Sequence, residues 1–323
     1  MNGRAAAGSI GAMNRSGVSR TNQVVEAVER AARLQDGVVS RDEARSLGAT
    51  RWDVRREVDA RRWEVHGRQT IAVHRASLDQ RAQWRFALHE VGSRAALDGV
   101  TALEAGGLRG FTDGLHVSVA HGRKPRRLAI VRVHEIRAWT ESDVMGAGLR
   151  RVRPAIAAIR ATQWLHTDRQ AAAVLIMSVQ QRIVTASTLA SVMSAITRMR
   201  RRRLVMGVLA DITDGVRAMG ELDFAGLCRL AGLPEPSRQV VRLGPRGRVY
   251  LDVWWDQWGV IVEVEGAHHD EALNAVDDAL RQNSLTASCA SLLRIPVLGL
   301  RTEPAAFMAQ VREILTRRGW TPR

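Results

Sequence analysis

Residues 248–266 read Arg248-Val-Tyr-Leu-Asp-Val-Trp-Trp-Asp-Gln-Trp-Gly-Val-Ile-Val-Glu-Val-Glu-Gly266, and this stretch decides the fold of the C-terminal part of the chain. Two runs rich in β-branched and aromatic residues flank a turn signal at 256–259, a pattern that predicts a β-hairpin. If Gln257 and Trp258 form the turn, Asp252 lies directly opposite Glu263. Because Gln-Trp is not a favoured two-residue turn, a register shifted by one residue is the alternative.

Three carboxylates are expected to converge in this hairpin. Glu265 shares a face of its strand with Glu263, because strand side chains repeat every two residues, and Asp252 faces them from the neighbouring strand. Like charges buried in an apolar sheet are costly unless they are compensated, and a divalent cation would compensate them. The alternatives are that Asp252 is a surface residue beside the turn, and that the two glutamates form the solvated face of an edge strand.

The chain has 323 residues, enough for two or three domains with separate cores. Its formal net charge is +15, which favours nucleic acid or another polyanion as the partner. The basic residues are almost all arginine, and Lys124 is the only lysine. The composition bias of a GC-rich genome is therefore the alternative explanation of the charge.

Other functional classes find little support in the sequence. Cys228 and Cys289 are the only cysteines and lack the spacing of a zinc site or a disulfide framework, which is typical of a cytoplasmic protein. The longest apolar run, 171–177, is too short to span a bilayer, so no membrane partner is expected. No phosphate-binding loop, dinucleotide-binding glycine motif or nucleophile elbow is present. Residues 1–21 are rich in Gly, Ala, Ser and Arg, and a disordered tail is expected there.

Residues 22–76 are expected to form a winged helix-turn-helix, because three helices, at 22–35, 41–47 and 51–60, precede a small hairpin within 63–73. Ser40 and Thr50 can cap the second and third helices. Arginines on and just beyond the third helix could enter a major groove or contact phosphates. A solvated basic helix in a domain that packs only against protein is the alternative. The DNA-binding candidates are Arg51, Arg55, Arg56 and Arg62.

This stretch resembles the N-terminal winged-helix domain of AbiEi-type antitoxins from type IV toxin–antitoxin systems. The resemblance implies DNA binding by this part of the chain, with a cognate toxin or defence-system protein as a further partner. Because winged helices serve many unrelated functions, the resemblance bears on fold more than on activity. The matching residues are Gly37 to Ala44, Leu47-Gly48, Val54 to Arg62, and Ile71-Ala-Val73.

Residues 77–213 are expected to form a mixed α/β region followed by helices. A helix is predicted over 81–91, and strands over 115–120 and 128–136 are joined by the basic turn 121–127. Residues 154–214 are predicted to be mostly helical, with a buried helix at 171–181 and another over 187–203 that ends in an arginine cluster. Both basic segments have two explanations, contact with a polyanion or simple solvation.

The last region, 214–323, is predicted to follow the order α-β-β-β-α-β-α. Its helices are expected over 219–231, 274–288 and 305–317, and its strands over 237–243, 248–255, 260–265 and 292–298. The whole chain is therefore expected to be an α/β protein of the α+β multidomain kind.

This order of elements, with Asp on one strand and Glu-x-Glu on the next, resembles the restriction-endonuclease-like superfamily, known by its PD-(D/E)xK motif. Within that superfamily the chain is similar to very-short-patch-repair endonuclease-like proteins. All the matching residues lie within 214–323. They are Glu221, Gly232 to Pro236, Leu251-Asp252, Val262 to Gly266, His268-His269, Asp277, Arg281 to Asn283, and Leu293 to Val297.

The resemblance implies a metal-dependent phosphodiesterase that acts on double-stranded DNA. Asp252 and Glu263 would bind Mg²⁺ or Mn²⁺, because hard cations take oxygen ligands. Glu221 would join through an outer shell or bind a second metal. The pair His268-His269 would shuttle a proton or contact the phosphate, and Arg281 would stabilise the transition state.

The chain departs from the family pattern at its last position, where lysine is usual and Glu265 stands here. No lysine occurs in 214–323, so none from another element can replace it. Very-short-patch-repair-like members often carry an acidic residue there with a nearby histidine. Structural alternatives remain for other positions: His268-His269 as a pair after a glycine turn, and Asp277 with Arg281 as an ion pair on one helix face.

Three functional hypotheses follow from these patterns. The leading one is a Mg²⁺-dependent DNA endonuclease of repair or phage defence, with the N-terminal domain binding DNA or a partner. The second is an antitoxin-like transcriptional regulator whose nuclease-like domain is inactive, which the missing lysine favours. The third is a protein–protein module of a toxin–antitoxin pair. Because an inactive site has no reason to keep carboxylates in an apolar strand, the endonuclease is preferred.

Overall fold

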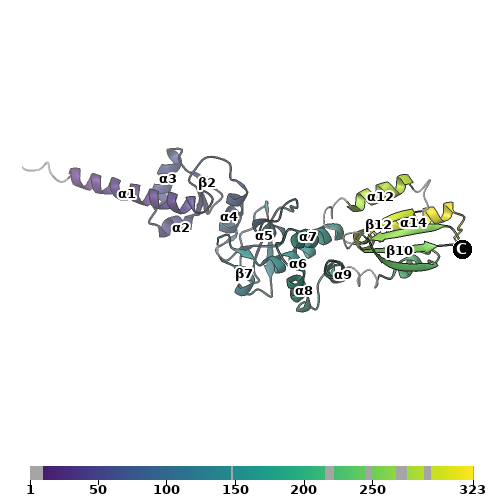
Figure 1. Ribbon diagram of the computed structural model, residues 1–323. Helices are drawn as coiled ribbons and strands as arrows, with labels where there is room; N and C mark the ends of the chain where they lie inside the picture. The colour runs from purple at the N-terminus through teal and green to yellow at the C-terminus, as the bar shows by residue number, and fades with distance from the viewer. Residues whose placement is uncertain are drawn as a thin grey trace, which may run out of the picture. The chain divides into compact units, whose positions relative to one another are not determined.

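The computed structural model describes residues 10–146, 148–214, 222–244, 249–266, 275–286 and 292–322 (Figure 1). The fold is mixed α/β, as predicted. The chain divides into two compact units, Met1–Leu97 with Gly114–Val152, and Asp98–Asp113 with Arg153–Arg323. The predicted boundaries at 76/77 and 213/214 both lie inside a unit. Within the described ranges, no helix is long and apolar enough to cross a membrane.

The first unit begins with three helices and a small antiparallel sheet of order β1-β3-β2. Ser40 accepts a hydrogen bond from the backbone N–H of Glu43, and Thr50 accepts one from that of Asp53. Both predicted helix caps are therefore confirmed. The elements are α1 (Ile10–Arg33), β1 (Val38–Ser40), α2 (Arg41–Ser46), α3 (Arg51–Asp59), β2 (Glu64–His66) and β3 (Thr70–Ala72).

Two features of this segment differ from the sequence-based expectation. Helix α1 starts at Ile10, so the expected disordered tail is wrong for residues 10–21; residues 1–9 lie outside the described residues. No proline interrupts this stretch, and extending an existing helix costs far less than starting one. The strand β1 was not predicted, because its three residues are too few to show an alternating pattern.

Helix α4 (Gln80–Val91) and a five-stranded sheet complete the unit. The sheet order is β6-β5-β4-β8-β7. Strands β5 and β6 pair in parallel, so the chain between them runs back along the sheet before β6 begins. The elements are β4 (Ala96–Leu97), β5 (Leu115–Ala120), β6 (Val131–Ile136), the short helix η1 (Glu141–Asp143), β7 (Val144–Met145) and β8 (Arg151–Val152).

A buried carboxylate on α4 ties the small sheet to the rest of this unit. Glu90 accepts hydrogen bonds from the backbone N–H groups of Arg68, Gln69 and Thr70 at 2.9, 2.6 and 3.1 Å, and it pairs with Arg126. Gly67 must be glycine here, because its φ is +67° and a Cβ would lie 2.6 Å from the Glu90 carboxyl carbon.

The second unit contains the predicted helical segment. Its helices are α5 (Gly99–Ala105), α6 (Pro154–Trp164), α7 (Asp168–Gln180), α8 (Ala186–Ser194) and α9 (Arg202–Thr213). The helix predicted over 187–203 is two helices. Arg201 has a left-handed φ of 62°, and its side chain is 6 % exposed. This side chain donates hydrogen bonds to the carbonyls of Thr162, Leu165 and His166. This member of the arginine cluster is therefore structural.

A four-stranded sheet of order β12-β11-β10-β9 forms the rest of the second unit. Strand β10 is antiparallel to both β9 and β11, and β11 is parallel to β12. The helix α13 was not predicted; its Arg301 donates two hydrogen bonds to Asp211 of α9, which links helices and sheet across the predicted boundary. The elements are α11 (Phe224–Leu230), β9 (Arg238–Leu243), β10 (Val249–Trp255), β11 (Val260–Glu265), α12 (Ala275–Thr286), β12 (Leu292–Pro296), α13 (Val297–Thr302) and α14 (Pro304–Arg317).

We expect Glu90→Gln to lower the free energy of unfolding by about 3 kcal/mol, because it removes the partner of Arg126 and turns an amide donor towards backbone donors. The midpoint of urea unfolding, followed by circular dichroism, measures this loss. Glu135→Gln is the matched control, since the pair Arg127–Glu135 lies at the surface and is worth about 0–1 kcal/mol. Equal midpoints for the two variants would show that Glu90 does not anchor the unit.

Candidate active site

The hairpin register brings Asp252 directly opposite Glu263 and Tyr250 opposite Glu265. The connection between the strands is the four-residue turn 256–259. The predicted register is therefore confirmed, and the alternative shifted by one residue is wrong.

The two faces of this sheet differ sharply in polarity. Leu251, Val253 and Trp255 of β10 lie on the apolar face, which is buried. Asp252 and Glu263 point to the opposite face, and their side chains are 6 % and 16 % exposed. Because β10 and β11 are the two inner strands, Asp252 is not a surface residue beside the turn, and the glutamates are not on an edge strand.

Two arginines from the flanking strands compensate the carboxylates. Arg242 of β9 forms a two-point contact with Asp252 and donates to Glu263 through Nη2 at 3.2 Å. Arg294 of β12 donates through Nε to Glu263 at 3.1 Å and lies 4.0 Å from Glu265. The hydrogen bond with Asp252 raises the pKa of Arg242, which keeps it charged. The cation required by the buried charges is thus supplied by the protein.

The donor set also fits a divalent cation. Nη2 of Arg242 lies 2.9 Å from Asp252 Oδ1 and 3.2 Å from Glu263 Oε1, so oxygens of two strands converge on one cationic atom. Mg²⁺ takes one or two carboxylates and completes its shell with water and phosphate. Arg242 is half exposed and lies on the edge strand, so its side chain can turn into solvent. Within the described part of the chain, no three His, Cys, Asp or Glu side chains are close enough together to hold a metal ion by themselves.

Of the remaining predicted site residues, only Arg281 lies within the described part of the chain. Arg281 pairs with Asp278 on α12. Asp277 accepts a hydrogen bond from Arg169 at 2.6 Å, so the predicted Asp277–Arg281 ion pair is replaced by two others. Glu221, His268 and His269 lie outside the described residues.

Sequence reasoning missed Arg242 and Arg294. Arg242 could have been found from the alternation of side chains along β9. Once the antiparallel register with β10 is known, this alternation places Arg242 on the same face as Asp252 and diagonally across from it. Arg294 follows from the parallel pairing of β12, which sets it beside Glu263. The side chain of Asn283 fixes that strand, because it donates to the Arg294 carbonyl at 2.9 Å.

The third helix of the first unit offers a second candidate site. Arg51 and Arg55 are exposed, and Arg51 stacks over Trp52, which is 63 % exposed. Arg56 and Arg62 instead hold the buried carboxylate of Glu57. The hydrogen bond from Arg62 is the main cause that lowers the pKa of Glu57. All four predicted DNA-binding arginines are therefore exposed, but two of them also compensate a buried carboxylate.

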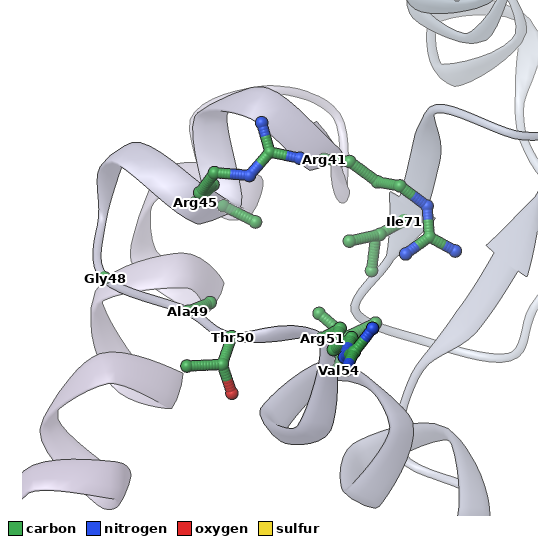
Figure 2. A pocket seen from close by; sticks show the side chains of 9 residues that line it. Arg41, Arg45, Gly48, Ala49, Thr50, Arg51, Val54 and Ile71 are labelled. Atoms are coloured by element: carbon green, nitrogen blue, oxygen red, sulfur yellow. The ribbon is translucent and has the colours of Figure 1, made fainter.

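A hollow of about 440 Å³ lies between α2 and α3 (Figure 2). Arg41, Arg45 and Arg51 line it from the two helices, with Val54 and Ile71 at its base. Arg41 donates to the carbonyl of Arg68 at 2.8 Å, and Arg45 pairs with exposed Asp42. Arg41 and Arg45 were not predicted as DNA-contact residues. They line the same hollow as Arg51 only because of the way α2 packs beside α3, which the sequence pattern does not show.

No protein-family model matches the chain, and no curated protein sequence matches it either. The chemical roles of the two candidate sites are therefore inferred from their geometry.

We expect Arg242→Gln to lower the midpoint of thermal unfolding, because Asp252 then lacks its cation. Adding Asp252→Asn should recover part of the loss, since the buried charge that needed compensation is gone. Differential scanning fluorimetry of the two single variants and the double variant measures this coupling. Arg238→Gln is the control, because Arg238 stacks on Trp254 at 4.5 Å and pairs with exposed Asp256. Strictly additive effects would mean that Arg242 does not stabilise Asp252.

Proposed function

We propose that the second unit carries a metal-dependent DNA endonuclease site of the restriction-endonuclease-like kind, and that a winged helix in the first unit contacts double-stranded DNA. The observation that carries the proposal is the pairing of Asp252 with Glu263 on the two inner strands, with both carboxylates directed at one cationic position. The described order α11-β9-β10-β11-α12-β12-α13-α14, which adds only α13 to the expected order, supports the nuclease fold. The hairpin of β2 and β3, which follows α2 and α3 and pairs with β1, supports the winged helix.

In this proposal Asp252 and Glu263 would hold Mg²⁺ or Mn²⁺, which would lower the pKa of a bound water molecule and offset charge on the phosphate. Arg242, once released from the carboxylates, and Arg294 would donate hydrogen bonds to phosphate oxygens, for which a planar guanidinium is well suited. Glu265 is the most exposed of the three acids, at 38 %, and its carboxylate can accept a proton from water. Arg294 takes the place of the missing lysine as the positive charge beside Glu265.

A second candidate, a DNA-binding regulator without cleavage, is favoured by one specific observation. Arg242 already satisfies both carboxylates, so the charges are stable without a metal. The same N-terminal arginines would then bind operator DNA, and the acidic face would be structural.

We expect purified protein to nick supercoiled plasmid with Mg²⁺ or Mn²⁺ and to lose this activity in chelator. Asp252→Asn and Glu263→Gln should each reduce the rate about 100-fold or more, because the loss of a metal ligand removes several kcal/mol of transition-state stabilisation. Glu313→Gln, at an exposed helix pair, is the matched control. Nicking at the wild-type rate by both site variants would refute the assignment.

Manganese binding without DNA, followed by electron paramagnetic resonance, separates the two candidates. For an endonuclease, Arg242→Gln should bind Mn²⁺ more tightly than wild type, because no cation competes for the carboxylates, and Asp252→Asn should not bind it. For a regulator, none of the three proteins binds Mn²⁺ at this site.

We expect Arg45→Gln and Arg51→Gln to weaken binding to a DNA duplex. Each should reduce the slope of log K against log salt by about 0.9 for every phosphate that the variant no longer neutralises. Arg56→Gln should have a smaller effect, because Arg56 is held by Glu57. Fluorescence anisotropy at several salt concentrations measures all three. An Arg56→Gln loss as large as that of Arg51→Gln would contradict the division of the arginines described above.

A further inference from the structure

A second basic hollow, distinct from both sites above, lies within the first unit. It has a volume of about 490 Å³ and is lined by the end of α4, by Arg126 and Arg150, and by Lys124, the only lysine of the chain. A smaller hollow of about 190 Å³ shares Gly92, Ser93 and Lys124 with it and adds Arg94 and Arg123. We call these two adjoining spaces the Lys124 hollow.

The charges around the Lys124 hollow do not cancel. Its acidic residues are already engaged, Asp42 by Arg45 and Glu90 by Arg126 and three backbone N–H groups. Lys124 and Arg123 are exposed, and within the described ranges neither side chain makes a hydrogen bond or an ion pair. Unpaired cations at the wall of a concave surface concentrate positive potential inside it.

Two buried nitrogen atoms of lining residues also lack partners. Nδ1 of His89 and Nε of Arg150 make no hydrogen bond within the described residues. Burial lowers the pKa of His89 to about 4, so its ring is neutral at pH 7. Buried polar atoms are nearly always paired, so the Nε–H of Arg150 indicates an occupant with an oxygen acceptor. Nδ1 of the neutral His89 ring donates to the same occupant in the tautomer that carries its proton there. Gly92, with φ of +139° and open space on its side-chain side, keeps the backbone at this wall uncovered.

We propose that the Lys124 hollow binds a phosphate group. A phosphate offers several acceptor oxygens to ammonium and guanidinium donors at once, and a volume of this size is typical of small-ligand sites. The two sources of this chemistry are a free nucleotide and the DNA backbone. The proposal does not rest on the endonuclease site, because no residue of the second unit lines the hollow.

The single lysine allows a direct test on the unmodified full-length protein. Lys124 is acylated with an amine-selective ester, and its labelled peptide is quantified by mass spectrometry with ATP, pyrophosphate, a DNA duplex, or sodium chloride of equal ionic strength. At about ten times the dissociation constant, an occupant should slow labelling about tenfold, and chloride should not. Protection by ATP or pyrophosphate identifies a free-phosphate ligand, and protection by DNA alone identifies the backbone. No protection by any of the three overturns the proposal.

A matched pair of variants tests specificity. Arg123→Gln should weaken binding of the protecting ligand about tenfold, measured by isothermal titration calorimetry or, for DNA, by anisotropy. Arg137→Gln removes the same charge from an exposed arginine of the same unit outside the hollow and should leave affinity nearly unchanged. Equal losses in the two variants would mean non-specific charge attraction and would overturn the proposal.

Discussion

A carboxylate removed from water needs a cation beside it, and this constraint organises the molecule. The buried acids among the described residues are Glu57, Glu90, Asp98 and Asp252. Each is paired with arginine: Glu57 with Arg56 and Arg62, Glu90 with Arg126, Asp98 with Arg160, and Asp252 with Arg242. An unpaired charge at any of these positions would cost several kcal/mol. Part of the arginine excess is therefore structural and carries no information about a partner.

The pairs differ in whether the cation can leave. Glu90 also holds three backbone N–H groups, so displacing its arginine would leave the carboxylate fixed and uncompensated. Arg242 instead reaches Asp252 and Glu263 from the edge strand and is half exposed. The proposed function requires that another cation replace Arg242, and its position on an exposed edge distinguishes it from Arg126 beside Glu90. For the proposed DNA contact, Arg51 is exposed beside Trp52, whereas Arg56 also compensates the buried carboxylate of Glu57.

Local patterns predicted much of this fold. The turn at 256–259 and the alternation of the two strands were enough to set Asp252 opposite Glu263, because antiparallel register follows from the turn. Ser40 and Thr50 predicted the starts of α2 and α3, because an N-cap side chain bonds to the backbone of the first turn of its own helix. The predictions failed where contacts with residues distant in sequence determine the local structure. The break between α8 and α9 lies at Arg201, whose side chain donates to carbonyls in α6 and in the residues just after it. The periodicity of the 187–203 segment contains no sign of such a distant contact.

The candidate site shows the same division. The sequence by itself determined that three acids share one face of a hairpin and that no lysine accompanies them. Only the tertiary structure decided what compensates them, because Arg242 and Arg294 come from strands whose positions depend on sheet order. Likewise, the sequence marked the segment 121–127 as basic, and the fold placed Lys124 at the wall of a hollow with His89 and Arg150. Charge and alternation are properties of neighbouring residues, whereas compensation of a buried charge is settled by whichever element packs beside it.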